Sequence, residues 1–248
     1  MLETAVALVL GHLVADFLLQ SDRMARTKAR PASLAAHLGV VAAASWIALG
    51  MPPAPLPILA VVITHGLTDM AKARLAPRGF AGFSLDQAAH LAAIWIVASL
   101  WPGTWAQGLW AQPFLIERLP GLARLPEAMA LGAGLVCAVW AGGYAVRELM
   151  HGLKDFPDDP EKDMSLPNGG QMIGRLERLM ILMLLVADQP DGIGLLIAAK
   201  SILRFNELAK DASDRRASEY VIIGTLASFA WAIGVGFVTQ AATHALAP

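Results

Sequence analysis

The chain has 248 residues, of which 56% are hydrophobic and only 16% are charged, and its formal net charge is −1. Soluble domains carry about 25% charged residues, so this balance excludes an ordinary soluble protein and favours a membrane-embedded one. The one cysteine, Cys137, lies inside an apolar run, which excludes a disulfide framework and a cysteine-ligated zinc cluster.

Apolar segments recur from one end of the chain to the other. A helix that crosses a bilayer needs roughly 20 mostly apolar residues. In chain order, we expect membrane spans at about 2–20, 32–49, 56–73, 84–101, 128–146, 172–188, 192–208 and 219–244. These segments predict an all-α polytopic membrane helix bundle of about eight transmembrane helices. The sixth and seventh segments also suit a shorter, partly re-entrant hairpin, because a tight Asp-Gln-Pro-Asp-Gly turn joins them.

Two further segments separate groups of spans. Residues 102–127 contain Trp105, Trp110 and several prolines, and because tryptophan favours the headgroup level of a bilayer, we expect an interfacial connection there. The acidic, proline-containing stretch 155–163 predicts a solvated cytoplasmic loop at about 147–171. The expected organisation is a membrane unit at 1–101, the connection at 102–127, and a C-terminal membrane unit at 128–248.

The basic residues indicate how the chain crosses the membrane. With eight spans, nearly all of the 19 lysines and arginines fall in or beside the loops of one side, at 21–31, 70–83, 147–171 and 209–218. Cytoplasmic loops carry an excess of basic residues. We therefore expect these loops in the cytoplasm, both termini outside, and a location in a bacterial inner (cytoplasmic) membrane.

The first hundred residues contain an internal repeat. His12-Leu-Val-Ala-Asp16 recurs as His65-Gly-Leu-Thr-Asp69, and His37 recurs as His90, with the same offset in both cases (65 − 12 = 90 − 37 = 53). The repeat units, at about 1–50 and 54–103, each hold two helices, so both copies cross the membrane in the same sense. We predict a parallel repeat of two helical hairpins, related by an axis along the membrane normal.

The repeated polar residues predict a buried site. Residues four apart share one helix face, and three His–Asp pairs have this spacing. Ionisable groups at membrane depth are costly, so they are expected to face one another rather than lipid. Their positions near the cytoplasmic ends of four helices predict one cluster, made of His12, Asp16, His37, His65, Asp69, Asp86 and His90.

Imidazole and carboxylate donors suit a divalent transition metal (Zn, Fe or Mn), and one or two ions would fit seven groups. The expected metal ligands are His12, Asp16, His65, Asp69 and His90. Asp86 or His37 would serve as the catalytic general base, and Gln20, Ser33 and Gln87 would orient these groups and the ligands through hydrogen bonds. Structural polar packing, a proton relay, haem ligation and ion transport are the alternatives.

Basic residues in the second half have two interpretations. Lys200 and Arg204 share one helix face by their spacing, and Arg175 with Arg178 nearly do. They either snorkel towards the leaflet surface and pair with glutamates such as Glu177, or form a substrate-binding patch for a lipid phosphate.

These motifs resemble an uncharacterised bacterial family of multi-pass membrane proteins, catalogued as domain of unknown function 3307. The resemblance lies in Gly-His12-Leu-Val-Ala-Asp16-Phe-Leu-Leu-Gln20, Thr-His65-Gly-Leu-Thr-Asp69-Met-Ala-Lys72 and Leu-Asp86-Gln87-Ala-Ala-His90-Leu, and the tail around Arg175 and Lys200 looks like longer members. The His-x-x-x-Asp hairpin is more loosely similar to membrane-bound metal-dependent hydrolases. The resemblance implies a fold and supplies no established reaction.

The cluster leads to one main functional hypothesis. It is a membrane-embedded metal-dependent hydrolase acting on a lipid-linked or phosphorylated substrate at the cytoplasmic leaflet, with membrane lipid as its partner and no nucleic acid. The alternative is a metal-ion or proton transporter, or a structural or haem-binding bundle. Transport needs polar access from both faces, whereas the outer halves of the first four helices are apolar, which favours chemistry at a one-sided site.

Overall fold

The computed structural model describes residues 1–21, 24–25, 27–28, 30–75, 77, 79–151, 153, 168–208 and 215–247, with the backbone alone for 75, 203–208 and 215–218. These residues are helical or in turns, and no strand occurs among them. The acidic stretch 155–163, expected as a cytoplasmic loop, lies outside the described residues. The flanks of that expected loop are helical on both sides, so 147–171 is too wide a boundary for it.

Every expected span coincides with a helix, although the ends differ by a few residues. The long helices are α1 (Leu2–Phe17), α3 (Pro31–Ala48), α4 (Leu56–Leu75), α5 (Phe80–Leu100), α8 (Leu125–Val136), α9 (Gly142–His151), α10 (Gly169–Val186), α11 (Asp191–Leu208) and α12 (Arg215–Leu246). A short π-helix, η3 (Cys137–Ala141), joins α8 to α9.

Five helical segments within the described residues are long and apolar enough to cross a membrane: Pro31–Ala48, Leu56–Arg74, Phe80–Leu100, Pro120–His151 and Glu219–Leu246. Helix α1 has only 16 residues, about 24 Å at 1.5 Å per residue, which is shorter than a hydrocarbon core of about 30 Å. Helices α10 and α11 carry several charged residues within their length. The protein is thus an all-helical chain with five candidate spans, and a count of eight stays a prediction.

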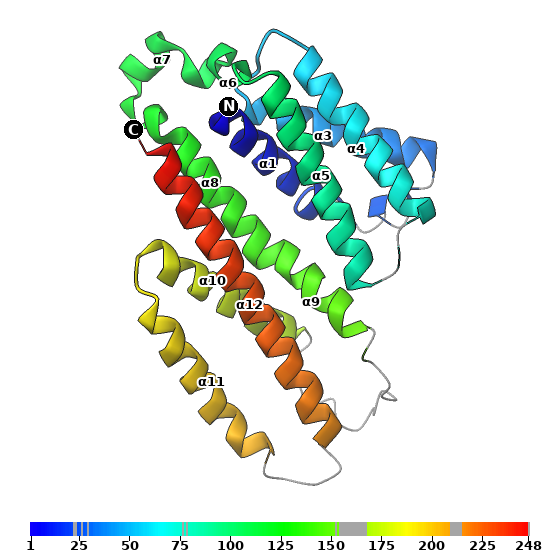
Figure 1. Cartoon of the computed structure of the whole chain (residues 1–248), viewed down its shortest axis with the longest axis vertical. Coiled ribbons are helices and arrows are strands. Elements are labelled where there is room, and N and C mark those ends of the chain that lie inside the picture. Colours follow the sequence, from blue (N-terminus) through cyan, green and yellow to red (C-terminus); the bar gives the residue numbers. More distant parts are fainter. Residues whose placement is uncertain are drawn as a thin grey trace. The chain divides into compact units, whose positions relative to one another are not determined.

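The chain divides into two compact units, the first made of Met1–Val136 with Ala241–Pro248 and the second of Cys137–Gln240. In the first unit, α1, α3, α4 and α5 form a closed ring in which each helix packs against the next and α5 returns to α1 (Figure 1). Helix α8 packs on α1. Four helices that surround one axis bury a common interior, and this interior holds the polar residues described below.

The apolar core of this bundle lies towards one end of it. Its members precede the histidines on α1 and α4 and follow them on α3 and α5, apart from Ala15 on α1 and Met129 on α8. The core consists of Ala7, Leu8, Ala15, Val41, Ala48, Leu49, Ile58, Val61, Ile94, Val97 and Met129. Because α1 and α4 run opposite to α3 and α5, these residues form one layer at the end of the bundle that holds the N-terminus of α1.

The connection at 102–127 is a series of short helices: α6 (Thr104–Gln107), η1 (Leu109–Ala111), α7 (Pro113–Arg118) and η2 (Pro120–Arg124). Trp110 Nε1 donates to the Ile47 carbonyl at 2.8 Å, and Leu109 N donates to the Gly50 carbonyl at 2.6 Å. At Gly108, any Cβ would collide with the Leu49 carbonyl oxygen, so only glycine allows this approach. The connection therefore belongs to the first unit, whose N-terminal part extends to Val136.

The second unit has its own core, built from Ile181 and Leu185 of α10, Ile193 of α11, and Phe229 and Ala232 of α12. The π-helix leaves backbone carbonyls without their usual helical donors, and side chains of the same unit supply the replacements. Trp231 Nε1 donates a hydrogen bond to the Cys137 carbonyl at 3.0 Å, and Arg178 Nη2 donates one to the Val139 carbonyl at 2.9 Å.

Candidate metal centre

All seven ionisable residues of the repeat meet in the interior of the four-helix bundle. They come from all four helices: His12 and Asp16 from α1, His37 from α3, His65 and Asp69 from α4, and Asp86 and His90 from α5. The side chains are 7% exposed at most. The spacing of four residues within each His–Asp pair turns both members inward, as expected from the sequence.

The four imidazole rings form a continuous group. His12 and His90 are stacked, with ring centroids 4.9 Å apart, and His65 lies 4.3 Å from His90. His37 extends the group, since its ring is 5.1 Å from that of His65 and its Nε2 lies 3.0 Å from His65 Nε2. Two imidazole nitrogens this close require that one carries a proton or that a cation lies beside them.

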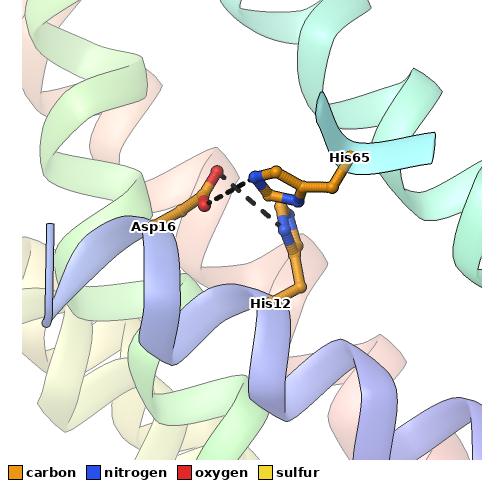
Figure 2. A group of neighbouring side chains, drawn as sticks. All are labelled: His12, Asp16 and His65. Carbon is orange, nitrogen blue, oxygen red and sulfur yellow. Dashed lines mark ion pairs between the residues drawn. The ribbon is translucent and has the colours of Figure 1, made fainter. Parts of the chain in front are cut away.

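Asp16 faces the histidines of three different helices. Its Oδ1 lies 3.3 Å from His37 Nε2 and 3.4 Å from His65 Nε2, and its Oδ2 lies 3.9 Å from His12 Nδ1. Figure 2 shows the carboxylate of Asp16 pointing from α1 towards the His65 ring, with His12 beside them. The two imidazoles and the carboxylate present nitrogen and oxygen lone pairs towards one small volume.

The hydrogen bonds around the cluster fix where two imidazole lone pairs lie. His90 Nδ1 is 2.9 Å from the Asp86 backbone carbonyl, so this nitrogen carries the proton and donates it. Gln87 Nε2 donates to Asp86 Oδ2 at 3.1 Å, which turns Gln87 Oε1 towards His12 Nε2 at 3.3 Å. The lone pairs then lie on His90 Nε2 and on His12 Nδ1.

Both of these nitrogens lack a hydrogen-bond partner within the described residues, and so does Asp86 Oδ1. Asp16 Oδ1 also lacks a hydrogen bond of good geometry there, although His37 Nε2 and His65 Nε2 lie 3.3 and 3.4 Å from it. Buried polar atoms are almost always hydrogen-bonded, and leaving one unsatisfied costs about 1–3 kcal/mol. Four such acceptors within one buried cluster make it a set of donors for a cation.

Two lysines that sequence reasoning did not place here also enter the cluster. Lys28 Nζ donates to both carboxylate oxygens of Asp69, at 2.8 and 2.9 Å, and Lys72 Nζ donates to Asp86 Oδ2 at 2.7 Å. Lys28 precedes α3 and its partner is 41 residues away, so no local pattern announces the contact. Lys72 lies one turn beyond Asp69 on α4, which is a weak signal for a partner nearby.

The expected supporting residues have the following contacts. Gln87 bridges His12 and Asp86, and Gln20 Nε2 donates to His37 Nδ1 at 3.3 Å. Ser33 shares a hydrogen bond of 2.8 Å with Thr27, and no hydrogen bond joins it to the cluster within the described residues. The two glutamines hold imidazole rings in place, as hydrogen-bond partners of metal ligands do.

Three groups of side chains have donor atoms within 4.8 Å of one another, as metal ligands require. They are His12, Asp16 and His65; His37, His65 and Asp69; and Asp69, Asp86 and His90. Each combines imidazole with carboxylate, the donor set typical of Zn, Fe and Mn sites in helical bundles. The residues present therefore fit a divalent transition metal.

The basic residues expected to bind substrate lie in the second unit, and two of them have internal partners. Arg178, only 3% exposed, donates to Ser228 Oγ at 2.9 Å and to the π-helix carbonyl described above. Lys200 Nζ contacts Glu177 Oε2 at 2.6 Å and lies over the Phe229 ring. Arg175 is partly buried, and the side chain of Arg204 lies outside the described residues. These contacts agree with the structural interpretation of Arg178 and Lys200.

No curated protein and no solved structure matches the chain. One family model does match, over residues 5–113, which contain every residue of the His/Asp cluster. The match ends within the connection of short helices. It therefore covers less of the chain than the expected resemblance, which included the tail around Arg175 and Lys200. Residues 5–113, and with them the whole cluster, are similar to the family described as "Protein of unknown function (DUF3307)".

Proposed function

We propose that the chain is an integral membrane protein with a divalent transition-metal centre (Zn, Fe or Mn) in its N-terminal bundle, and that it is a metal-dependent hydrolase. The observation that carries the proposal is a group of buried acceptors that have no hydrogen-bond partner among the described residues: His12 Nδ1, Asp16 Oδ1, Asp86 Oδ1 and His90 Nε2. A bundle with only a structural role would be expected to satisfy these atoms internally. His12, Asp16 and His65 would hold the ion.

A bound divalent ion would lower the pKa of a coordinated water and so supply a nucleophile at neutral pH. The chain itself supplies the proton acceptor. Asp86 is held through Oδ2 by Lys72 and Gln87, and its buried Oδ1, which has no hydrogen-bond partner in the described part of the chain, can accept a proton. His37, the other candidate from the sequence, is less suited than Asp86, because Gln20 Nε2 donates to its Nδ1 and the proton of the neutral ring then lies on Nε2, beside Asp16.

Access to the centre from one side supports a hydrolase over a transporter. The apolar layer that contains Leu8, Val41 and Val97 closes one end of the bundle, and these side chains are 3% exposed or less. Towards the other end lie Lys28 and Lys72, whose side chains are 21% and 45% exposed. A transporter needs polar access to its site from both faces in turn, and the layer offers none.

A lipid-linked or phosphorylated substrate is the natural choice for a centre inside a membrane bundle. An apolar groove of about 610 Å³ lies between α1 and α3 beneath the connection, and Leu10, Val14, Val40, Ile47 and Trp110 are among its lining residues. Such a groove suits an acyl chain. The basic loops support a cytoplasmic position for the open end, in a bacterial inner membrane with eight spans and both termini outside.

The parallel repeat belongs to the same proposal, and the contacts of equivalent residues support it. The imidazole of His12 lies 3.9 Å from the carboxylate of Asp16, and that of His65 lies 3.6 Å from the carboxylate of Asp69, each within one helix. In the repeat, His37 is equivalent to His90 and His65 to His12, so the His37–His65 pair corresponds to the His90–His12 pair. The ring centroids of these two pairs are 5.1 and 4.9 Å apart. The lysine contacts do not follow this symmetry, because Ala81 and Leu19 occupy the positions equivalent to Lys28 and Lys72.

The hydrolase is tested by activity of the detergent-purified protein on lipid phosphoesters, lipid diphosphates and lipid carboxylic esters. We expect hydrolysis of one class, abolished by a chelator, restored by metal, and reduced at least 100-fold in Asp86→Asn or in His37→Ala. His151→Ala is the matched control, since His151 is an exposed histidine of α9 outside the cluster, and it should keep full activity. Absence of hydrolysis of all three classes by metal-loaded protein would contradict the proposal.

A further inference from the structure

The three groups of donor atoms are not equally available to an ion, because the lysines occupy two of them. Asp69 belongs to the second and third groups, and Lys28 Nζ donates to both of its carboxylate oxygens. Asp86, in the third group, also accepts from Lys72. The first group, His12, Asp16 and His65, is the one whose carboxylate has no lysine within salt-bridge distance among the described residues.

We infer that the centre takes one divalent ion, at His12, Asp16 and His65, and that the Lys28 ammonium stands where a second ion would otherwise bind. The inference rests on the proposed metal-binding function and sets the number of ions. An ammonium and a metal ion compete for the same carboxylate lone pairs. Lys28 Nζ makes a short hydrogen bond to each of the two carboxylate oxygens of Asp69, so both oxygens are already engaged.

The charges of the buried cluster favour the same count. Three carboxylates and two ammonium groups leave one negative charge with neutral imidazoles (two positive against three negative). One divalent ion changes this to one positive charge, whereas two would give three positive charges in a buried site. Uncompensated buried charge is strongly unfavourable, so the arrangement with one ion is the better balanced.

The possible metal ligands outside the first group indicate what removal of Lys28 would do. His90 Nε2 and Asp86 Oδ1 are buried and without hydrogen-bond partners in the described part of the chain. They lack only a free carboxylate to complete the third group, Asp69, Asp86 and His90, which shares no residue with the first. A variant without Lys28 would release Asp69 and so create a second metal site.

The test is the metal content of the full-length protein, purified in detergent, loaded with Zn²⁺ or Mn²⁺, freed of excess ion and analysed by mass spectrometry. We expect one equivalent in the wild type and two in Lys28→Met. Lys72→Met is the matched control: it also removes an ammonium group from the cluster, but Lys28 still holds Asp69, so the content should stay at one. Lys28→Met/Asp69→Asn should return to one equivalent, because the released carboxylate is gone.

Each outcome decides between the two proposals. Two equivalents in the wild type, or one equivalent in Lys28→Met, would overturn the single-ion inference while leaving the metal centre intact. Absence of metal from the wild type would overturn the proposed function itself. If Lys28→Met does not fold, Lys28→Gln keeps a side chain of similar length without the charge, and the wild-type count still tests the inference directly.

Discussion

The ion pair between Lys28 and Asp69 is predicted to stabilise the N-terminal bundle, and the metal-free protein should show this in a double-mutant cycle. Asp69 has a side chain 2% exposed and Lys28 one that is 21% exposed, with Nζ 2.8 Å from Oδ1. Coulomb's law at that distance, with an effective dielectric constant of about 20, gives about 6 kcal/mol. Desolvation offsets part of this, and removal of one partner of a buried pair typically costs about 3–5 kcal/mol.

We therefore expect Lys28→Met to lower the free energy of unfolding by about 3 kcal/mol in the presence of a chelator. Adding Asp69→Asn should recover most of the loss, because the buried carboxylate that lacked a partner is then neutral. The assay is equilibrium unfolding in mixed micelles of detergent and sodium dodecyl sulfate, followed by circular dichroism. A coupling free energy below about 1 kcal/mol, the value of an exposed ion pair, would refute the claim that this pair is buried in the folded protein.

Two further predictions concern positions that shape the centre without serving as ligands. Gln87→Leu removes the hydrogen bond that orients His12, so metal affinity, measured by competition with a chelating dye, should fall about 10- to 100-fold while the helical content is kept; unchanged affinity would show that Gln87 has no such role. Gly11→Ala would place a Cβ 3.0 Å from Ser45 Cα and should cost about 1–3 kcal/mol of unfolding free energy by forcing α1 away from α3. Gly39→Ala, where a Cβ meets nothing within 4 Å, is its control, and equal stability of the two variants would contradict the close packing.

The cluster could be predicted from sequence because its signal is local and repeated. His12 with Asp16, and His65 with Asp69, share helix faces by a spacing that any α-helix enforces. The membrane adds a strong constraint, since charged groups avoid lipid and turn towards one another. Together these two rules were enough to bring seven side chains from four helices to one interior.

The lysine partners could not be predicted, because they depend on tertiary contacts. Lys28 meets Asp69 across 41 residues, and its position before α3 gives no periodic pattern. Arg178 is a similar case: its spacing suggested a surface patch with Arg175, whereas the π-helix at Cys137–Ala141 leaves a carbonyl that Arg178 satisfies. A helical irregularity of this kind has no signature in an apolar sequence.

Hydropathy also predicted more spans than the described helices support. By their apolar residues alone, the segments of α1 and α10 were expected to span the membrane just as that of α5 was. However, α1 is only 16 residues long, and α10 carries Arg175, Glu177 and Arg178 within its helix. The last two of these charged residues are buried by contacts inside the second unit. Length, mean hydropathy and the number of charged residues together separate the five candidate spans from the other described helices.

The metal content of the wild-type protein, compared with Asp16→Ala and with His151→Ala, tests the central claim most directly. Asp16 faces three of the four imidazoles of the cluster, whereas His151 is an exposed histidine at the end of α9. We expect tightly bound transition metal in the wild type and in His151→Ala, and its loss from Asp16→Ala in a sample that keeps the helical circular dichroism spectrum of the wild type. Equal metal content in Asp16→Ala and the wild type, or a wild type that binds none, would contradict a metal centre built on this carboxylate.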